Sequence, residues 1–209
     1  MEDVLDVYSR PYDEMRPVVC MDEKPVQLFA NARKSLHSKD GRIEYEDNEY
    51  IRNGTACIFM FTEPLNGWRV ADAREHRTRE DWAKQIEWLL QDQYPNAEKI
   101  VLVMDNLNTH NVASLYQTFE PKHARDLAAR LEIHYTPKHG SWLDIAEIEL
   151  SALARQCIGK NRIPDLETLR NLLVPWYTDR NKKQHGVDWQ FTTDDARGKL
   201  KRLYPIINI

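Results

Sequence analysis

A nearly continuous apolar run, Lys99–Met104, stops abruptly at Asp105, and it constrains the fold more than any other feature of the sequence. Unbroken rather than alternating hydrophobicity is typical of a strand covered on both faces, as the strands of parallel sheets are. A shorter apolar run, Val18–Met21, ends in the same way at Asp22. Because ligand sites in open α/β sheets lie beyond the carboxyl ends of strands, both aspartates are expected at the working edge of a sheet. The alternative for each is turn chemistry that caps the next element.

Two capping boxes predict where helices begin. The first, Thr78–Asp81, opens a helix over residues 79–92, whose apolar side chains share one face. In the second, Ser141 is followed by Asp144 three residues later, which predicts a helix that runs to about Cys157.

The other segments are predicted from apolar periodicity and from the turn residues that bound them. They are strands over 55–62 and 131–135 and helices over 122–130 and 165–181. Residues 1–16 are expected to be a linker or entry segment, and the polar residues 31–50 a loop or a hairpin excursion. The alternation of strands and helices predicts the α/β class, with a mixed β-sheet flanked by α-helices.

Charge is divided unevenly along the chain. The 209 residues carry a formal net charge of −4, which argues weakly against nucleic-acid binding, since such domains usually carry a basic excess. Residues 151–209, however, hold 11 Lys and Arg against 6 Asp and Glu, and residues 1–150 carry a net charge of −9. This split indicates an acidic body with a basic C-terminal portion. An ordinary solvated helical surface is the alternative.

The sequence shows no signal for a membrane or for an oxidising compartment. No apolar stretch approaches the roughly 20 residues of a bilayer span, and the N-terminus lacks the pattern of a secretory signal. We therefore expect a soluble, cytoplasmic protein. The cysteines are few and form no Cys-x-x-Cys pair, so they are interpreted as small buried apolar residues rather than as disulfides or zinc ligands. They are Cys20, Cys57 and Cys157.

A third carboxylate strengthens the interpretation of the two aspartates. Glu147 shares a helical face with the apolar Leu143 and Leu150, so it should point toward the core or its rim. An ionised carboxylate there is costly unless a cation or a basic partner offsets the cost. Asp144 is interpreted as a helix-start residue and Glu149 as a solvated residue off the apolar stripe. Three carboxylates meeting from two strand ends and a helix would form an oxygen-only site, which suits Mg²⁺ or Mn²⁺.

Three motifs in this order closely resemble the DDE transposases of bacterial insertion sequences related to Tc and mariner elements. They are Val18–Lys24, Val101–His110 and His134–Glu147. The resemblance covers residues 17–205, the expected catalytic domain, and leaves 1–16 as the entry segment and 206–209 as a tail. It implies a ribonuclease-H-like fold.

The resemblance also implies a function. Asp22, Asp105 and Glu147 would be the catalytic and metal-binding triad, and they would hold two Mg²⁺ or Mn²⁺ ions for phosphodiester chemistry. The implied reactions are hydrolysis at a transposon end and attack of the exposed 3′ hydroxyl on target DNA. The family pattern has Asn where this sequence has Asp144, which leaves the total charge and the metal preference of the site open.

Basic residues near the motifs and toward the C-terminus are candidates for contacts with DNA. The candidates are Lys24, His110, Lys138, His139, Lys182 and Lys183, with Arg180, Arg197, Lys199, Lys201 and Arg202 as further phosphate contacts. Such contacts give affinity and salt dependence rather than sequence choice. For Lys24 the alternative is a surface lysine. For His110 the alternatives are a structural hydrogen bond or the orientation of a carboxylate.

Partners follow from the resemblance as well. Relatives recognise DNA ends through an N-terminal helix-turn-helix region, and only about 16 residues precede the first predicted strand here. The DNA reader is therefore expected on a separate subunit, or to have been removed or lost, and the chain alone should bind end DNA weakly. A homodimer on DNA is expected because transposition brings two ends together.

Two other functions compete with transposition. A metal-dependent phosphohydrolase of small phosphate esters would show an Asp-x-Asp motif or a Gly-rich phosphate loop, and neither occurs at Asp22 or Asp105. A catalytically silent or co-opted element product would bind DNA without cutting it. The intact triad argues against simple decay but leaves that second alternative open.

Overall fold

The structure, a computed structural model, describes residues 1–31, 36–37, 44–45, 49–138, 140–159, 161–184 and 186–204. A mixed five-stranded sheet forms its centre, in the order β5-β4-β1-β6-β7. The strands are β1 (Val18–Asn31), β4 (Tyr50–Glu63), β5 (Trp68–Arg74), β6 (Ile100–Met104) and β7 (Leu131–Tyr135). Strands β1, β4 and β5 pair antiparallel, whereas β6 pairs parallel with both β1 and β7. The predicted mixed sheet of the α/β class is confirmed.

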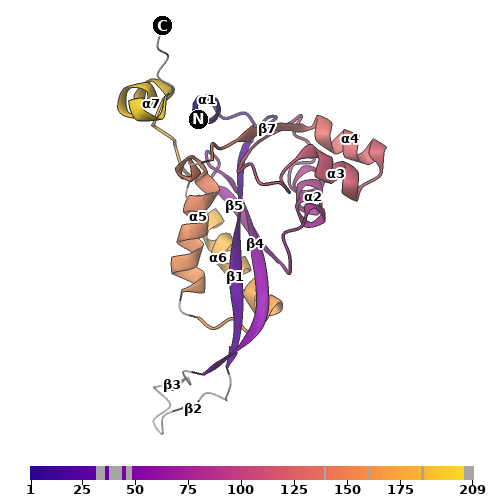
Figure 1. The fold of residues 1–209 in the computed structure, drawn as a ribbon, viewed down its shortest axis with the longest axis vertical. Coiled ribbons are helices and arrows are strands. Elements are labelled where there is room, and N and C mark those ends of the chain that lie inside the picture. The colour runs from indigo at the N-terminus through magenta and orange to yellow at the C-terminus, as the bar shows by residue number, and fades with distance from the viewer. Residues whose placement is uncertain are drawn as a thin grey trace.

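Helices cover both faces of the sheet (Figure 1). One face carries α1 (Glu2–Tyr8), α5 (Ile145–Leu153), α6 (Leu166–Lys182) and α7 (Thr193–Lys199), and the other carries α2 (Arg79–Trp88), α3 (Val112–Thr118) and α4 (Pro121–Ala129). Alternate residues of β1 serve the two cores: Cys20 packs with the α5 and α6 side, and Met21 with the α2 side. Successive side chains of a strand point to opposite faces, so this alternation fixes which way the residues after Met21 point.

Short π- and 3-10 segments extend several helices. They are η1 (Leu89–Gln93), η2 (Ser141–Leu143), η3 (Ala154–Ile158) and η4 (Lys201–Leu203). The capping box of Thr78 with Asp81 is present at the start of α2, and α2 with η1 accounts for the helix predicted over 79–92. Among the described residues, no helix is long and apolar enough to cross a bilayer.

Some elements were not predicted. Helix α1 lies within the expected linker 1–16, yet Val4, Leu5 and Val7 are at most 1% exposed and belong to the core. The segment is therefore packed against the domain over its first eight residues, although it is too short to show a helical period. Of the polar stretch 31–50, the structure describes the antiparallel pair β2 (Leu36–His37) and β3 (Glu44–Tyr45). Residues 32–35, 38–43 and 46–48 lie outside the described residues, as does the predicted tail 206–209.

The cysteine prediction is confirmed for two positions. Cys20 and Cys57 are buried and free, and Cys157 is free and half-buried. Burial raises the pKa of the Cys57 thiol to about 12, so this group is an inert thiol at neutral pH.

Candidate active site

The middle of β1, the carboxyl end of β6 and the start of α5 enclose an acidic cavity of about 630 Å³. The prediction that the first strand ends at Asp22 is wrong, because β1 continues through its pairing with β4 to Asn31. Most of the residues that line the cavity are of polar type, and they come from four segments of the chain: Asp22, Asp105, Asn106, Leu107, Thr136, Pro137, Lys138, Asp144 and Glu147. The structure thus brings all three predicted triad residues to one cavity. Their catalytic role remains a prediction.

Strand register explains why the two aspartates meet. Met21 on β1 is paired with Met104, the last residue of the parallel strand β6, so Asp22 and Asp105 are the next residues along the two segments. Neighbouring strands lie about 4.8 Å apart, which places the two aspartates side by side. Because Met21 and Met104 both face the α2 side, alternation turns Asp22 and Asp105 toward the α5 side.

The two aspartates differ in their electrostatic surroundings. Burial raises the pKa of Asp22 to about 6, although the Glu23 backbone N–H donates a 2.7 Å hydrogen bond to its Oδ1. A hydrogen bond from His110 lowers the pKa of Asp105, with Nδ1 2.6 Å from Oδ1. One acid of the pair therefore resists ionisation, while the other is held in its charged form.

The start of α5 differs from the sequence prediction. The predicted capping box at Ser141 does not open the helix; residues Ser141–Leu143 form η2, and Asp144 is the N-cap of α5. The Asp144 Oδ1 accepts a 2.9 Å hydrogen bond from the Ala146 backbone N–H. Its helix-start role is thus confirmed, but the side chain is also 3% exposed and lines the acidic cavity. Glu147 follows in the first turn of α5 and is half-buried.

The donor set of this cavity fits a hard divalent cation. All four acidic groups offer oxygen, which Mg²⁺ and Mn²⁺ prefer. Asp144 Oδ2 is buried and has no hydrogen-bond partner among the described residues, and burial raises the pKa of this carboxyl well above its usual value. Within the described part of the chain, however, no three Asp, Glu, His or Cys side chains stand close enough to hold a metal as they are. Like charges keep such groups apart until a cation offsets their repulsion.

Glu149 is not the solvated residue that the sequence suggested. Its side chain is 4% exposed and lies 3.0 Å from Arg69 Nε and 2.9 Å from Arg180 Nη2. Arg69 comes from β5 and is itself 1% exposed. The two guanidinium groups offset the cost of burying this carboxylate, so Glu149 is part of the fold rather than of the acidic cavity.

The predicted DNA contacts fall in different places. Lys138 lines the cavity, whereas Lys24 is half-buried on β1 and does not line it. His110 is 1% exposed, so it is not accessible for the expected contact with DNA. Its hydrogen bond to Asp105 fits the alternative role, the orientation of a carboxylate. Lys182 and Lys183 lie at the end of α6, away from the cavity lining, and Lys183 pairs with Asp179 at 2.6 Å. His139 lies outside the described residues.

Sequence reasoning missed Glu23, the residue that completes the surroundings of Asp105. Its side chain is 3% exposed, and its Oε1 lies 2.9 Å from His110 Nε2. A usable signal was present: strand alternation turns Glu23 to the face opposite Asp22, where a lone carboxylate needs a partner.

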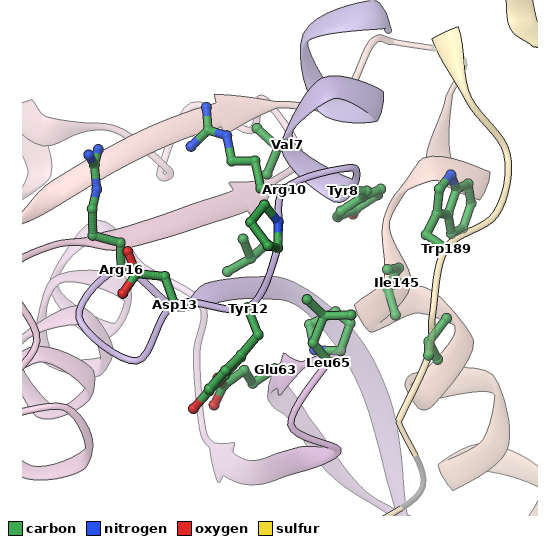
Figure 2. Close-up of a pocket in the computed structure, with 14 residues that line it drawn as sticks. Val7, Tyr8, Arg10, Tyr12, Asp13, Arg16, Glu63, Leu65, Ile145 and Trp189 are labelled. Carbon is green, nitrogen blue, oxygen red and sulfur yellow. The ribbon is translucent and has the colours of Figure 1, made fainter. Parts of the chain in front are cut away.

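A second pocket lies between the N-terminal segment, the β4–β5 turn and the C-terminal segment (Figure 2). Aromatic and apolar side chains dominate its lining, among them Tyr8, Tyr12 and Trp189. Its volume of about 20 Å³ leaves room for roughly one water molecule. It therefore offers no space for a phosphodiester, and the acidic cavity is the better candidate.

Comparisons with known proteins find a family and similar structures for this chain. A family model described as DDE superfamily endonuclease matches residues 17–170. The structure is similar to the Mos1 mariner paired-end complex with Mn (14% identity, TM-score 0.58, covering 87% of this chain and 54% of that one). It is also similar to the catalytic domain of Mos1 mariner transposase (13% identity, TM-score 0.54, covering 87% of this chain and 86% of that one).

A third similar structure is the Mos1 strand transfer complex, at 15% identity and a TM-score of 0.55. The chain spans about half the length of the Mos1 chains in the two complexes. These likenesses confirm the ribonuclease-H-like fold. A comparison with curated proteins finds no match.

Proposed function

We propose that this chain, which belongs to the DDE superfamily endonucleases, is the catalytic domain of a DNA transposase. One observation carries the proposal: Asp22 from β1, Asp105 from the end of β6 and Glu147 from α5 line a single cavity. These acids are far apart in the sequence, and neither the sheet nor the helix needs an acid at these positions for its own formation. A cavity lined with carboxylates is costly to the fold, so it fits a function in which cations are bound.

Asp22, Asp105 and Glu147 would hold two divalent ions, with Asp144 as a further buried carboxylate beside them. When bound, such ions activate a water on one side of a phosphate and stabilise the leaving oxygen on the other. The protein supplies the frame. The register of β1 and β6 sets the two aspartates side by side, and the N-cap at Asp144 fixes where the first turn of α5 presents Glu147.

DNA is the proposed substrate. Lys138 lies in the lining of an otherwise acidic cavity, where its ammonium group would meet a phosphate that enters beside the cations. The proposed sequence of reactions is hydrolysis at a transposon end, followed by attack of the freed 3′ hydroxyl on a target strand. The similar Mos1 structures include a paired-end complex and a strand transfer complex, which supports the same two stages here.

Recognition of specific ends is proposed to need more than these residues. We assign it to a helix-turn-helix reader, on a separate subunit or elsewhere, and to a dimer that brings two ends together. By itself the chain should then bind DNA weakly and with little preference for sequence. A mobility-shift titration that shows tight, end-specific binding by these residues would contradict this assignment.

Nicking of supercoiled plasmid DNA tests the catalytic proposal. With Mn²⁺ or Mg²⁺, the wild-type chain should convert supercoiled plasmid into nicked circles, and Asp105→Ala should not. Asp126→Asn on the exposed side of α4 is the matched control and should cut like the wild type. Circular dichroism should show that all three chains are folded.

Other outcomes would point to the competing functions. Release of phosphate from p-nitrophenyl phosphate without nicking would support a phosphohydrolase of small esters. Binding of DNA with no cleavage in either metal would support a catalytically silent element product.

A further inference from the structure

The turn that follows β6 brings an imidazole back onto the acid at the strand end. His110 Nδ1 lies 2.6 Å from Asp105 Oδ1, and the His110 backbone N–H donates to the Leu107 carbonyl at 2.9 Å. The Leu107 backbone N–H reaches the same Asp105 oxygen at 3.3 Å. Among the described residues, the His110 ring and the Leu107 backbone N–H both bond to Asp105 Oδ1, and neither contacts Oδ2.

The imidazole is fixed on every side. Its ring stacks on Trp82 of α2, with centroids 6.2 Å apart and planes at 29°. The Tyr135 hydroxyl donates to the His110 carbonyl at 2.8 Å. The side chain of His110 is 1% exposed, whereas that of Asp105 is 48% exposed. An exposed carboxylate is thus tethered to a buried group that has little freedom to move.

The far nitrogen of the ring has a partner of its own. His110 Nε2 lies 2.9 Å from Glu23 Oε1, and the Glu23 side chain is 3% exposed. Glu23 follows Asp22 on β1, so it points to the opposite face of the sheet, under the ring rather than into the acidic cavity. The other carboxylate oxygen of Glu23, Oε2, is buried and has no hydrogen-bond partner among the described residues. The contact of Oε1 with His110 is therefore the polar contact that holds this side chain.

We propose that His110 and Glu23 are positioning residues that hold the Asp105 carboxylate in one orientation, with Oδ1 bound to the imidazole and Oδ2 left to a divalent cation. The proposal deepens the proposed function and rests on it, because it concerns metal binding at the same cavity. Outer groups that orient a ligand through a histidine are a recurrent feature of metal sites.

The geometry of the three groups is that of a relay. Asp105 and Glu23 engage the two nitrogens of one ring, with Nδ1 2.6 Å from Asp105 Oδ1 and Nε2 2.9 Å from Glu23 Oε1. The ring cannot turn without breaking one of these hydrogen bonds, so Glu23 fixes the ring from one side and the ring fixes the Asp105 carboxylate on the other.

Binding of Mn²⁺ alone to the full chain tests the proposal without relying on cleavage. Titration calorimetry and Mn²⁺ electron paramagnetic resonance would be measured for wild type, His110→Gln, Glu23→Gln and the double variant. We expect each single variant to weaken Mn²⁺ affinity by about 10- to 100-fold. The double variant should be no weaker than the weaker single variant, because the two residues act in series through one carboxylate.

His123→Gln is the matched control. His123 also pairs with a glutamate, Glu87 at 2.6 Å, but it lies on α4 outside the acidic cavity, and its loss should leave Mn²⁺ affinity unchanged. Thermal melts of the metal-free chains separate folding from positioning, because a merely structural role lowers the melting temperature without changing the affinity of folded protein.

Each remaining outcome is decisive. Wild-type affinity in a folded His110→Gln or Glu23→Gln chain would overturn the positioning role and leave the proposed function intact. Failure of the wild type itself to bind Mn²⁺ and to nick DNA would overturn both. If His110→Gln does not fold, the affinity of Glu23→Gln decides.

Discussion

Asp22 on β1 and Asp105, directly after the parallel strand β6, lie side by side, yet their pKa values move in opposite directions. Burial raises the pKa of Asp22 to about 6, and the hydrogen bond from His110 lowers that of Asp105. Pairs of acids whose surroundings push their pKa values apart are typical of active sites. Because Asp22 is the buried acid of the pair, keeping it ionised lowers the free energy of unfolding of the metal-free protein.

Removing that cost should stabilise the metal-free protein. A raised folded-state pKa means that the folded chain binds the proton more tightly, so stability falls as pH rises from about 4 to 6 and the penalty is full above pH 6. We expect Asp22→Asn to raise the free energy of unfolding at pH 7.5 by about 2 kcal/mol. Urea unfolding without metal measures it.

The same variant should lose plasmid nicking, because it lacks a proposed metal ligand. Asp126→Asn, on the exposed side of α4, should change neither quantity. An Asp22→Asn chain that is less stable than the wild type at pH 7.5 would refute the prediction that the Asp22 carboxylate destabilises the metal-free protein.

The buried ion pairs of Glu149 predict a large loss of stability. Glu149→Gln removes the buried carboxylate from its ion pairs with Arg69 and Arg180, and breaking a buried pair from one side costs about 3–5 kcal/mol. Equilibrium unfolding in urea measures it, with the exposed Glu167→Gln at the start of α6 as control. A loss below about 1 kcal/mol would mean that water replaces the lost carboxylate.

The packing of α1 predicts that the first residues contribute to stability. The Tyr8 hydroxyl donates to the Leu143 carbonyl at 2.6 Å, directly before Asp144. Tyr8→Phe leaves that buried carbonyl without its donor and should cost about 1–2 kcal/mol of unfolding free energy. Tyr12→Phe, in an exposed residue of the same segment, should change it by less than about 0.5 kcal/mol. Equal effects of the two substitutions would favour a loosely attached linker.

An ion-pair cluster on β7 should contribute to the stability of the fold at neutral pH, and this contribution should be lost in acid. Hydrogen bonds from Arg10, and then from His134 and Arg16, together lower the pKa of Glu132 to about 2, against some burial. A lowered carboxyl pKa gives stability that is present above about pH 4.5 and lost as pH falls through 2. Glu132→Gln should cost about 1 kcal/mol at pH 7 after solvent screening and nothing near pH 2. Unfolding curves at both values check it; a cost that persists at pH 2 would argue against the charge effect.

Sequence reasoning succeeded where burial is uniform. All five residues of β6 are buried, which appears in the sequence as an unbroken apolar run. It failed at β5, because the buried face of that edge strand carries Arg69, Ala71 and Ala73 rather than large apolar residues. Helix α1 was missed for a related reason: its core contacts fall within seven residues, fewer than two full periods.

The candidate site was only partly predictable. Asp105 and Glu147 could be placed from a strand end and a helical face, since those arguments are local, whereas Asp22 lies within a strand that continues to Asn31 and reaches the cavity through its register with β6. The pairing of Glu149 with Arg69, and of Glu23 with His110, joins segments far apart in the chain. Strand alternation could have placed Glu23 on the face opposite Asp22, but only the fold shows which residues are partners in these two buried pairs.

The central claim is that separate acids form one cation-binding site, and anomalous diffraction from crystals soaked in Mn²⁺ tests it most directly. We predict anomalous peaks in the acidic cavity within coordination distance of carboxylate oxygens of Asp22, Asp105 and Glu147, and their loss in Asp105→Ala. Well-ordered crystals with no Mn²⁺ in that cavity, or with the ion bound only elsewhere, would contradict the claim.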